Sequence, residues 1–140
     1  MARGAINHIA LTVSDLASAE TRFYSPVLNF LGYQKVEDIP GKMALWFNGP
    51  AQLAVNLWQA ESALADVAHA RYAPGFHHCA FGVESRAEVD DLHRLLGDNG
   101  IRVLDAPAEY PQYAPGFYAV YFEDFDGLKF EAVHMPEFQA

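Results

Sequence analysis

The sequence has 140 residues, a length typical of one compact domain, and 51% of them are hydrophobic, so a sizeable core can form. The formal net charge of −9 disfavours nucleic acid and anionic membranes as partners, because both bind basic surfaces. The single cysteine, Cys79, excludes an internal disulfide. No apolar run reaches transmembrane length, and the first residues turn polar too soon for a signal peptide, so we expect a cytoplasmic protein.

The first predicted module, residues 1–58, opens with a strand at 7–13. Large apolar side chains occupy one face of this strand, and His8 with two small residues occupies the other, because successive side chains alternate between faces. A helix is expected around 15–25, where Pro26 interrupts it or starts a second turn. Three short strands are expected to follow: 33–37, 43–48 and 52–58.

The second predicted module, residues 77–140, follows a linker at 59–76 that is partly helical at most. Its first strand, 77–83, again places a histidine, His78, and two small residues on one face, while alternation directs His77 to the opposite face. The remaining elements of the module are a helix that starts at the capping box of Ser85 and Glu88 and ends at Gly100, and strands at 101–105, 117–123 and 128–134.

The two modules are an internal repeat, which is weak in identity but ordered along the chain. NHIALTV at 7–13 is similar to HHCAFGV at 77–83, an offset of 70 residues. The later matches have an offset of 75 residues: LWF at 45–47 with VYF at 120–122, and LAVNL at 53–57 with LKFEA at 128–132. The element order is therefore βαβββ twice.

One such module alone leaves an open sheet edge and a half-covered concave face. We therefore predict an α+β fold in which two tandem βαβββ modules pair into a curved, partly closed mixed sheet around a central cavity. Both histidine strands would lie at the floor of that cavity, within a single domain that spans residues 1–140.

The repeat, its element order and the segments NHIALTV, HHCAFGV and YFEDFDGLKFEAVH resemble the vicinal oxygen chelate superfamily. That family includes glyoxalases, fosfomycin-resistance transferases, extradiol dioxygenases and bleomycin-binding proteins. The resemblance implies metal ligands on the first and last strands of the modules, which fall on His8, His78 and Glu131. Asn56 stands at the matching last-strand position of the first module, where glyoxalases have a fourth ligand.

Two imidazoles and one carboxylate leave open positions on a divalent ion, and Zn, Fe(II), Mn and Ni all accept such a set. Open positions are what a catalytic metal needs, because substrate oxygens must bind there. The amide of Asn56 is a poor ligand beside imidazoles, so we interpret it as a hydrogen-bonding pocket residue. The alternative for each strand histidine is an ordinary hydrogen-bonded core residue. His69 and His93 are expected to be solvated.

Aromatic residues supply further candidates for the pocket. Trp58 shares a strand face with Asn56, and Trp46 is matched by the repeat to Tyr121. The irregular loop at 109–118 resembles a lid and contains Tyr113 and Tyr118. Tyr113, Tyr118 and Tyr121 are weak candidates for a catalytic acid or a substrate hydrogen bond, and the alternative is a loop fixed in place by buried tyrosines.

The resemblance implies a metal-dependent small-molecule enzyme: a lyase or isomerase, a ring-opening dioxygenase or a thiol transferase. The alternative is a metal-free protein of the bleomycin-resistance type, which binds a drug or metabolite. Paired modules with open sheet edges also predict a homodimer.

Overall fold

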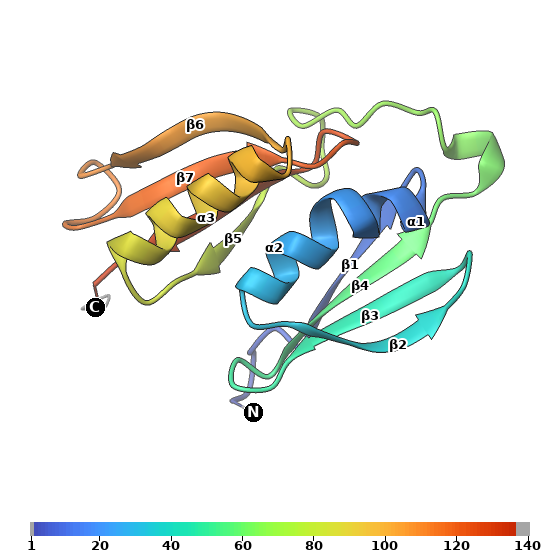
Figure 1. Cartoon of the computed structure of the whole chain (residues 1–140), viewed down its shortest axis with the longest axis horizontal. Helices are drawn as coiled ribbons and strands as arrows, with labels where there is room; N and C mark the ends of the chain where they lie inside the picture. Colours follow the sequence, from blue (N-terminus) through green and yellow to red (C-terminus); the bar gives the residue numbers. More distant parts are fainter. Residues whose placement is uncertain (1, 137–140) are drawn as a thin grey trace. The chain divides into compact units, whose positions relative to one another are not determined.

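The computed structural model describes residues 2–136 and divides the chain into two compact units, Met1–Val67 and Ala68–Ala140. Each unit contains one four-stranded mixed sheet and its helix, in the order βαβββ (Figure 1). The predicted α+β fold of two repeated modules is therefore confirmed, and the division falls inside the predicted linker at 59–76. The pairing of the modules around a shared cavity stays a prediction.

The first unit has the strand order β1-β4-β3-β2. Its strands are β1 (His8–Val13), β2 (Gln34–Ile39), β3 (Met43–Asn48) and β4 (Leu53–Gln59). The parallel pair β1–β4 requires a crossover, which the helical segment provides. One face of the sheet packs against this segment and buries Leu11, Val13, Val55 and Leu57, so the other face carries the smaller and more polar side chains.

The helical segment of the first unit continues past the predicted interruption at Pro26. It consists of α1 (Leu16–Ala19), a π-helical turn, η1 (Glu20–Tyr24), and α2 (Ser25–Phe30). Asp15 caps its start by accepting a hydrogen bond from the Ser18 backbone N–H at 3.0 Å. The widened turn precedes Pro26, which has no backbone N–H and occupies the first turn of α2, a position that tolerates proline.

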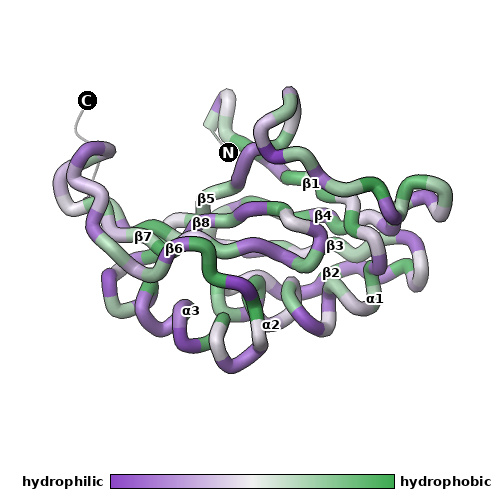
Figure 2. Tube along the Cα trace, turned by 90° about the horizontal axis from the view of Figure 1, so that it is seen from above, coloured by the Kyte–Doolittle hydropathy of each residue, from purple (hydrophilic) through white to green (hydrophobic). Residues whose placement is uncertain are grey.

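The second unit has the strand order β5-β8-β7-β6. Its elements are β5 (Cys79–Gly82), α3 (Arg86–Asp98), β6 (Arg102–Glu109), β7 (Tyr118–Glu123) and β8 (Lys129–His134). Ser85 caps α3 as predicted, since its Oγ accepts from the Glu88 N–H at 3.2 Å. Val89, Leu92 and Leu96 recur along one face of α3 and are fully buried, while most of its other positions are hydrophilic (Figure 2).

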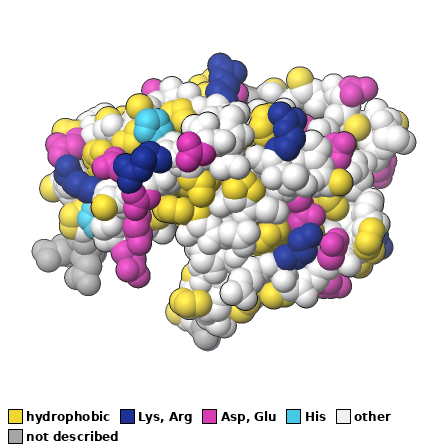
Figure 3. Space-filling view, viewed as in Figure 1, with side chains coloured by type: hydrophobic (Ala, Val, Ile, Leu, Met, Phe, Trp, Pro, Cys, Tyr) yellow, Lys and Arg dark blue, Asp and Glu magenta, His cyan; other side chains and the backbone are white. Residues whose placement is uncertain are grey.

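Outside the sheets, the linker contains a short 3-10 turn, η2 (Ser62–Leu64). No helix in residues 2–136 is long and apolar enough to cross a membrane. On the face drawn in Figure 3, acidic and basic side chains are interspersed. Local ion pairs such as Arg102–Glu123, at 3.0 Å, accompany this mixture of charges.

The strand registers correct the predicted match of Trp46 with Tyr121. Leu45 lies opposite Asn56 in the first sheet, and Tyr121 lies opposite Glu131 in the second, so Tyr121 corresponds to Leu45. Trp46 then corresponds to Phe122, one residue further along the chain. A slip of one residue moves a side chain to the other face of a sheet, and the predicted pocket position of Trp46 is therefore wrong.

Trp46 lies instead on the face that packs against the helical segment. It is only 3% exposed, and its Nε1 donates a hydrogen bond to Glu20 Oε2 at 3.0 Å. Glu20 is itself buried and also pairs with Lys35 at 3.1 Å. The buried carboxylate is thus satisfied by an indole N–H and an ammonium group, which accounts for a glutamate inside the helix–sheet layer.

Candidate metal and substrate site

A pocket of about 420 Å³ opens in the second unit, over the face of β7 and β8 that points away from α3. Its polar lining includes two histidines and a glutamate: His77, His78 and Glu131. The parallel register places Ala80 beside Glu131, so the small-residue face of β5 and the carboxylate share one side of the sheet. Ala80 and Gly82 are not among the residues that line the pocket, so the role predicted for the small side chains, which is to leave room for a ligand, stays a prediction.

His78 and Glu131 form the central pair of the pocket. The distance between His78 Nε2 and Glu131 Oε2 is 3.3 Å. Glu131 is 4% exposed, and its other oxygen, Oε1, is buried without a hydrogen-bond partner in residues 2–136. An unsatisfied buried carboxylate oxygen costs about 1–3 kcal/mol or more. The pair therefore offers one imidazole nitrogen and one unused oxygen to a cation.

The surroundings of the pair shift the pKa values of both Glu131 and His78. Burial raises the pKa of Glu131, an effect that a hydrogen bond with Tyr121 and the charge of Lys129 oppose. Burial, with the charges of Lys129 and Arg71, lowers the pKa of His78. A lowered pKa favours the neutral imidazole, which is the form that binds metal ions.

His77 lies beside His78 in the pocket, and the prediction that it faces away is wrong. The two Nδ1 atoms are 2.6 Å apart. Residues 77 and 78 precede β5, which starts at Cys79, so strand alternation does not govern their side chains. Desolvation and the neighbouring His78 lower the pKa of His77. The two adjacent histidines, His77 and His78, are visible in the sequence, but strand alternation cannot predict the direction of side chains that precede the strand.

The first unit holds the other predicted site residues on one sheet face. His8 is the first residue of β1, and Asn56 and Trp58 lie two residues apart on β4. The register pairs Ala10 with Asn56, just as it pairs Ala80 with Glu131, so Asn56 and Glu131 are equivalent positions of the repeat. Asn56 Oδ1 is buried without a partner in the described residues, and Trp58 is 37% exposed.

Within residues 2–136, no three or more His, Cys, Asp or Glu side chains are grouped so as to hold a metal ion. The second unit supplies a two-residue donor set, His78 and Glu131, and His8 belongs to the first unit. A ligand set of all three residues therefore stays a prediction.

Four aromatic rings form the wall of the pocket: Tyr110, Tyr113, Phe117 and Tyr121. Tyr110 stacks on Tyr113 with centroids 5.7 Å apart and meets Tyr121 edge-on at 5.5 Å. Tyr113 is 63% exposed, whereas Tyr121 is buried. Burial and the charge of Glu131 raise the pKa of Tyr121, so its hydroxyl stays protonated and acts as a donor.

Two charged residues complete the lining. Lys129 Nζ lies 4.7 Å from the centroid of the Tyr121 ring. Asp105 comes from β6, at a position where the register with β7 shifts. The pocket thus combines flat apolar surface with donors and acceptors of both signs, which suits a small polar molecule with a planar or apolar part.

Tyr118, a weak candidate for a catalytic acid, is not among the residues that line the pocket. It is three residues from Tyr121 on β7, so its side chain leaves the sheet on the α3 side. Its hydroxyl donates to Asp90 at 2.7 Å, and Arg86 lies over its ring at 4.9 Å. Tyr118 therefore fastens α3 to β7.

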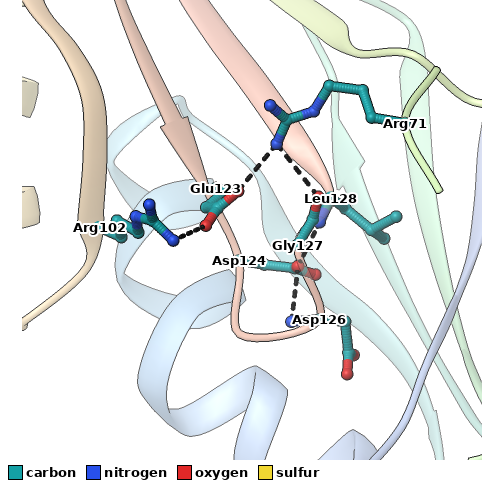
Figure 4. Close-up of polar contacts among 7 residues, drawn as sticks. All are labelled: Arg71, Arg102, Glu123, Asp124, Asp126, Gly127 and Leu128. Atoms are coloured by element: carbon teal, nitrogen blue, oxygen red, sulfur yellow. Dashed lines mark hydrogen bonds and ion pairs between the residues drawn. The ribbon is translucent and has the colours of Figure 1, made fainter. Parts of the chain in front are cut away.

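The end of the linker is tied to the hairpin that carries Glu131 (Figure 4). Arg71 Nη2 lies 2.8 Å from Glu123 Oε2, and Arg102 binds the other oxygen of Glu123 at 3.0 Å. Asp124 Oδ1 accepts from two backbone N–H groups of the following turn, those of Asp126 and Leu128, at 2.9 and 2.8 Å. These contacts fix the turn that leads into β8.

His69 also packs in this segment instead of being solvated as predicted. Its ring lies 6.0 Å from that of Phe76, and its Nε2 is buried without a partner in residues 2–136. Phe76 in turn lies 6.1 Å from Phe130 of β8. The segment before His77 is therefore part of the second unit.

Comparison with known proteins identifies relatives over most of the chain. Residues 5–132 match the family model described as "Glyoxalase/Bleomycin resistance protein/Dioxygenase superfamily". The uncharacterized protein YqjT of Bacillus subtilis (strain 168) is 33% identical over 128 residues, which cover 91% of this chain and 97% of that protein.

Solved structures are similar over nearly the full length. A candidate glyoxalase from Bacillus halodurans has a TM-score of 0.80 and 25% identity, covering 95% of this chain and 97% of that chain. The fosfomycin resistance protein FosX from Listeria monocytogenes has a TM-score of 0.71 and 21% identity, covering 96% of each chain. At that lower identity the likeness shows the fold alone.

Proposed function

We propose that this chain, which belongs to the Glyoxalase/Bleomycin resistance protein/Dioxygenase superfamily, is a metal-dependent enzyme acting on a small molecule. In this proposal His8, His78 and Glu131 hold one divalent ion. The observation that carries the proposal is the pair of His78 Nε2 and Glu131 Oε2, 3.3 Å apart, beside the unpartnered Glu131 Oε1. A buried carboxylate with a free oxygen next to a neutral imidazole fits a divalent cation.

The donor chemistry leaves Zn, Fe(II), Mn and Ni as candidates, since each accepts imidazole together with carboxylate. When bound, such an ion supplies Lewis acidity toward two oxygens of the substrate. Three ligands are the usual number in catalytic sites that keep an open position.

The remaining pocket residues orient the substrate. The aromatic wall, above all Tyr110 and Tyr113, offers a flat surface on which an apolar or planar part can lie. The protonated Tyr121 hydroxyl donates a hydrogen bond to Glu131 or to a substrate oxygen. Lys129 supplies a positive charge at the same wall, which favours a substrate with anionic oxygens. A substrate bound over the pocket would exclude water from these side chains.

The reaction belongs to one of three types: lyase or isomerase, ring-opening dioxygenase, or thiol transferase. The test is to load the protein separately with each of the four metals and to assay hemithioacetal, catechol and epoxide substrates, the last with a thiol. We expect turnover of one substrate class with at least one metal, and its loss in His78→Ala. Turnover that persists unchanged in the chelator-treated protein would contradict the proposal.

A metal-free binding protein is the second candidate, and the aromatic wall favours it. Stacking on Tyr110 and Tyr113 would hold a flat drug or metabolite whether or not an ion is present. The two candidates differ in one measurable respect. Ligand affinity that is the same with and without chelator supports simple binding, whereas affinity that falls with chelator supports metal-assisted chelation.

Asn56 is predicted to be dispensable for holding the metal. Its amide oxygen is a weaker donor than a carboxylate, although it occupies the position equivalent to Glu131. We expect Asn56→Ala to keep the metal affinity within about tenfold of the wild type, which is the usual range for groups that only support ligands. Isothermal titration with Zn measures this value. A loss as large as that of Glu131→Ala would make Asn56 a ligand.

We also propose that the protein is a homodimer. The edge strand β2 is exposed along all six residues, and it includes the apolar Val36 and Ile39, which are 59% and 40% exposed. Exposed edges of this kind favour pairing with another chain. Sedimentation velocity at micromolar concentration should give one species at twice the chain mass of 15.5 kDa. A single species at the chain mass would contradict the dimer.

A further inference from the structure

Each candidate histidine ligand is preceded by a side chain that contacts its Nδ1 atom. In the first unit, Asn7 Oδ1 lies 2.8 Å from His8 Nδ1. In the second unit, His77 Nδ1 lies 2.6 Å from His78 Nδ1. Residues 7 and 77 are separated by the same 70 residues as the two histidines, so both modules place a hydrogen-bonding partner at the same position of the repeat.

The contact of His77 has a defined consequence for His78. An imidazole has two nitrogens, and the group bonded to one of them determines what the other can do. With His77 at Nδ1, the ring of His78 is held so that Nε2 faces Glu131 Oε2 at 3.3 Å. Because a neutral imidazole can donate or accept at Nδ1, His77 can satisfy His78 Nδ1 in either tautomer.

The ring of His77 also contacts the segment before it. Its ring meets Tyr72 edge-on at 5.6 Å, and Tyr72 follows Arg71, which is tied to Glu123 at 2.8 Å. A chain of contacts therefore runs from the β7–β8 turn through the end of the linker to His77 and then to His78.

We propose that His77 is a positioning residue that holds the His78 ring in the orientation in which Nε2 can bind a metal ion. This inference rests on the proposed function. Without a cation, Glu131 Oε2 accepts the Nε2 proton of His78, and His77 Nδ1 donates to His78 Nδ1. When Nε2 binds a cation, the proton on His78 lies on Nδ1 and is donated to His77 Nδ1, whose own proton is then on Nε2. The number of protons on the two rings is the same in both states.

The first unit suggests a conservative variant for the test, because it has an asparagine at the position equivalent to His77. His77→Asn copies the solution of the first unit, where an asparagine contacts His8, and an amide side chain can donate or accept. His77→Ala removes the contact, and His93→Ala removes a histidine on α3 that does not line the pocket. Zn affinity is measured by isothermal titration for the three variants and the wild type.

We expect His77→Ala to weaken Zn binding by about 10- to 100-fold, the range found for groups that orient metal ligands. His77→Asn should stay within about tenfold of the wild type on the same scale, and His93→Ala should match the wild type. Equal Zn affinity of wild type and His77→Ala would overturn the proposal, as would an Asn variant no better than the Ala variant.

A second readout requires no metal. Long-range ¹H–¹⁵N correlation spectra of the metal-free protein report which nitrogen of His78 carries the proton. We expect one tautomer with the proton on Nε2 in the wild type, a single tautomer in His77→Asn, and an average of two tautomers in His77→Ala. Unchanged His78 nitrogen shifts in His77→Ala would refute the positioning role. If the wild type binds no Zn, the proposed function fails, and these shifts alone decide the role of His77.

Discussion

Replacing Glu131 by glutamine should lower the affinity for a divalent metal by more than about 100-fold, beyond the range caused by loss of a supporting group. The change removes the negative charge and leaves the shape of the side chain nearly intact. Glu131 is 4% exposed and has one unpartnered oxygen, and glutamine replaces its carboxylate with a neutral amide, which is a weaker donor to a divalent ion. Isothermal titration of Zn and Mn into chelator-treated protein measures the affinity.

Glu109→Gln is the matched control for this experiment. Glu109 lies at the end of β6 in the same unit, but it pairs with Arg86 at 2.5 Å and does not line the pocket. Its replacement removes the same charge from the chain and should leave metal affinity within about threefold, because screening weakens exposed charges at a distance. Equal affinities of the Glu131 and Glu109 variants would exclude Glu131 as a ligand.

Replacing Trp46 by alanine should destabilise the first unit by about 3–5 kcal/mol, the usual cost of truncating a buried Trp or Phe. The ring is 3% exposed in the layer between helix and sheet, and its loss also deprives the buried Glu20 of a hydrogen bond. Urea unfolding followed by far-ultraviolet circular dichroism measures the free energy of unfolding without relying on the removed fluorophore.

Trp58→Ala provides the comparison, since that ring is 37% exposed on the opposite face of the sheet. Its removal should cost about 1 kcal/mol or less, as is usual for side chains outside the core. If the two tryptophan variants were equally stable, the register that separates their faces would be wrong.

The contrast between Trp46 and Asn56 shows what the sequence can predict. Asn56 was matched correctly to Glu131, because the alternation LAVNL against LKFEA is bounded by turns that fix the register. Trp46 was matched to Tyr121 through three-letter segments with little information, and the true match is offset by one more residue. Because side chains alternate along a strand, that single residue decides between core and pocket.

Other differences arise where regular patterns stop. His77 precedes β5, so alternation does not apply to it, and its ring contacts both His78 and Tyr72. The tie between Arg71 and Glu123 joins residues 52 positions apart, and no local pattern indicates it. The helices and strands themselves were predictable, because caps and periodicity are local properties of the chain.

The metal content of untagged protein tests the central claim most directly. The protein is loaded with Zn, Mn, Fe(II) or Ni and passed through gel filtration, and its metal content is measured by inductively coupled plasma mass spectrometry. The account predicts about one ion per chain for the wild type with at least one of these metals, and loss of most of it in His78→Ala. A wild type that retains no ion, or a His78→Ala variant that retains as much as the wild type, would contradict it.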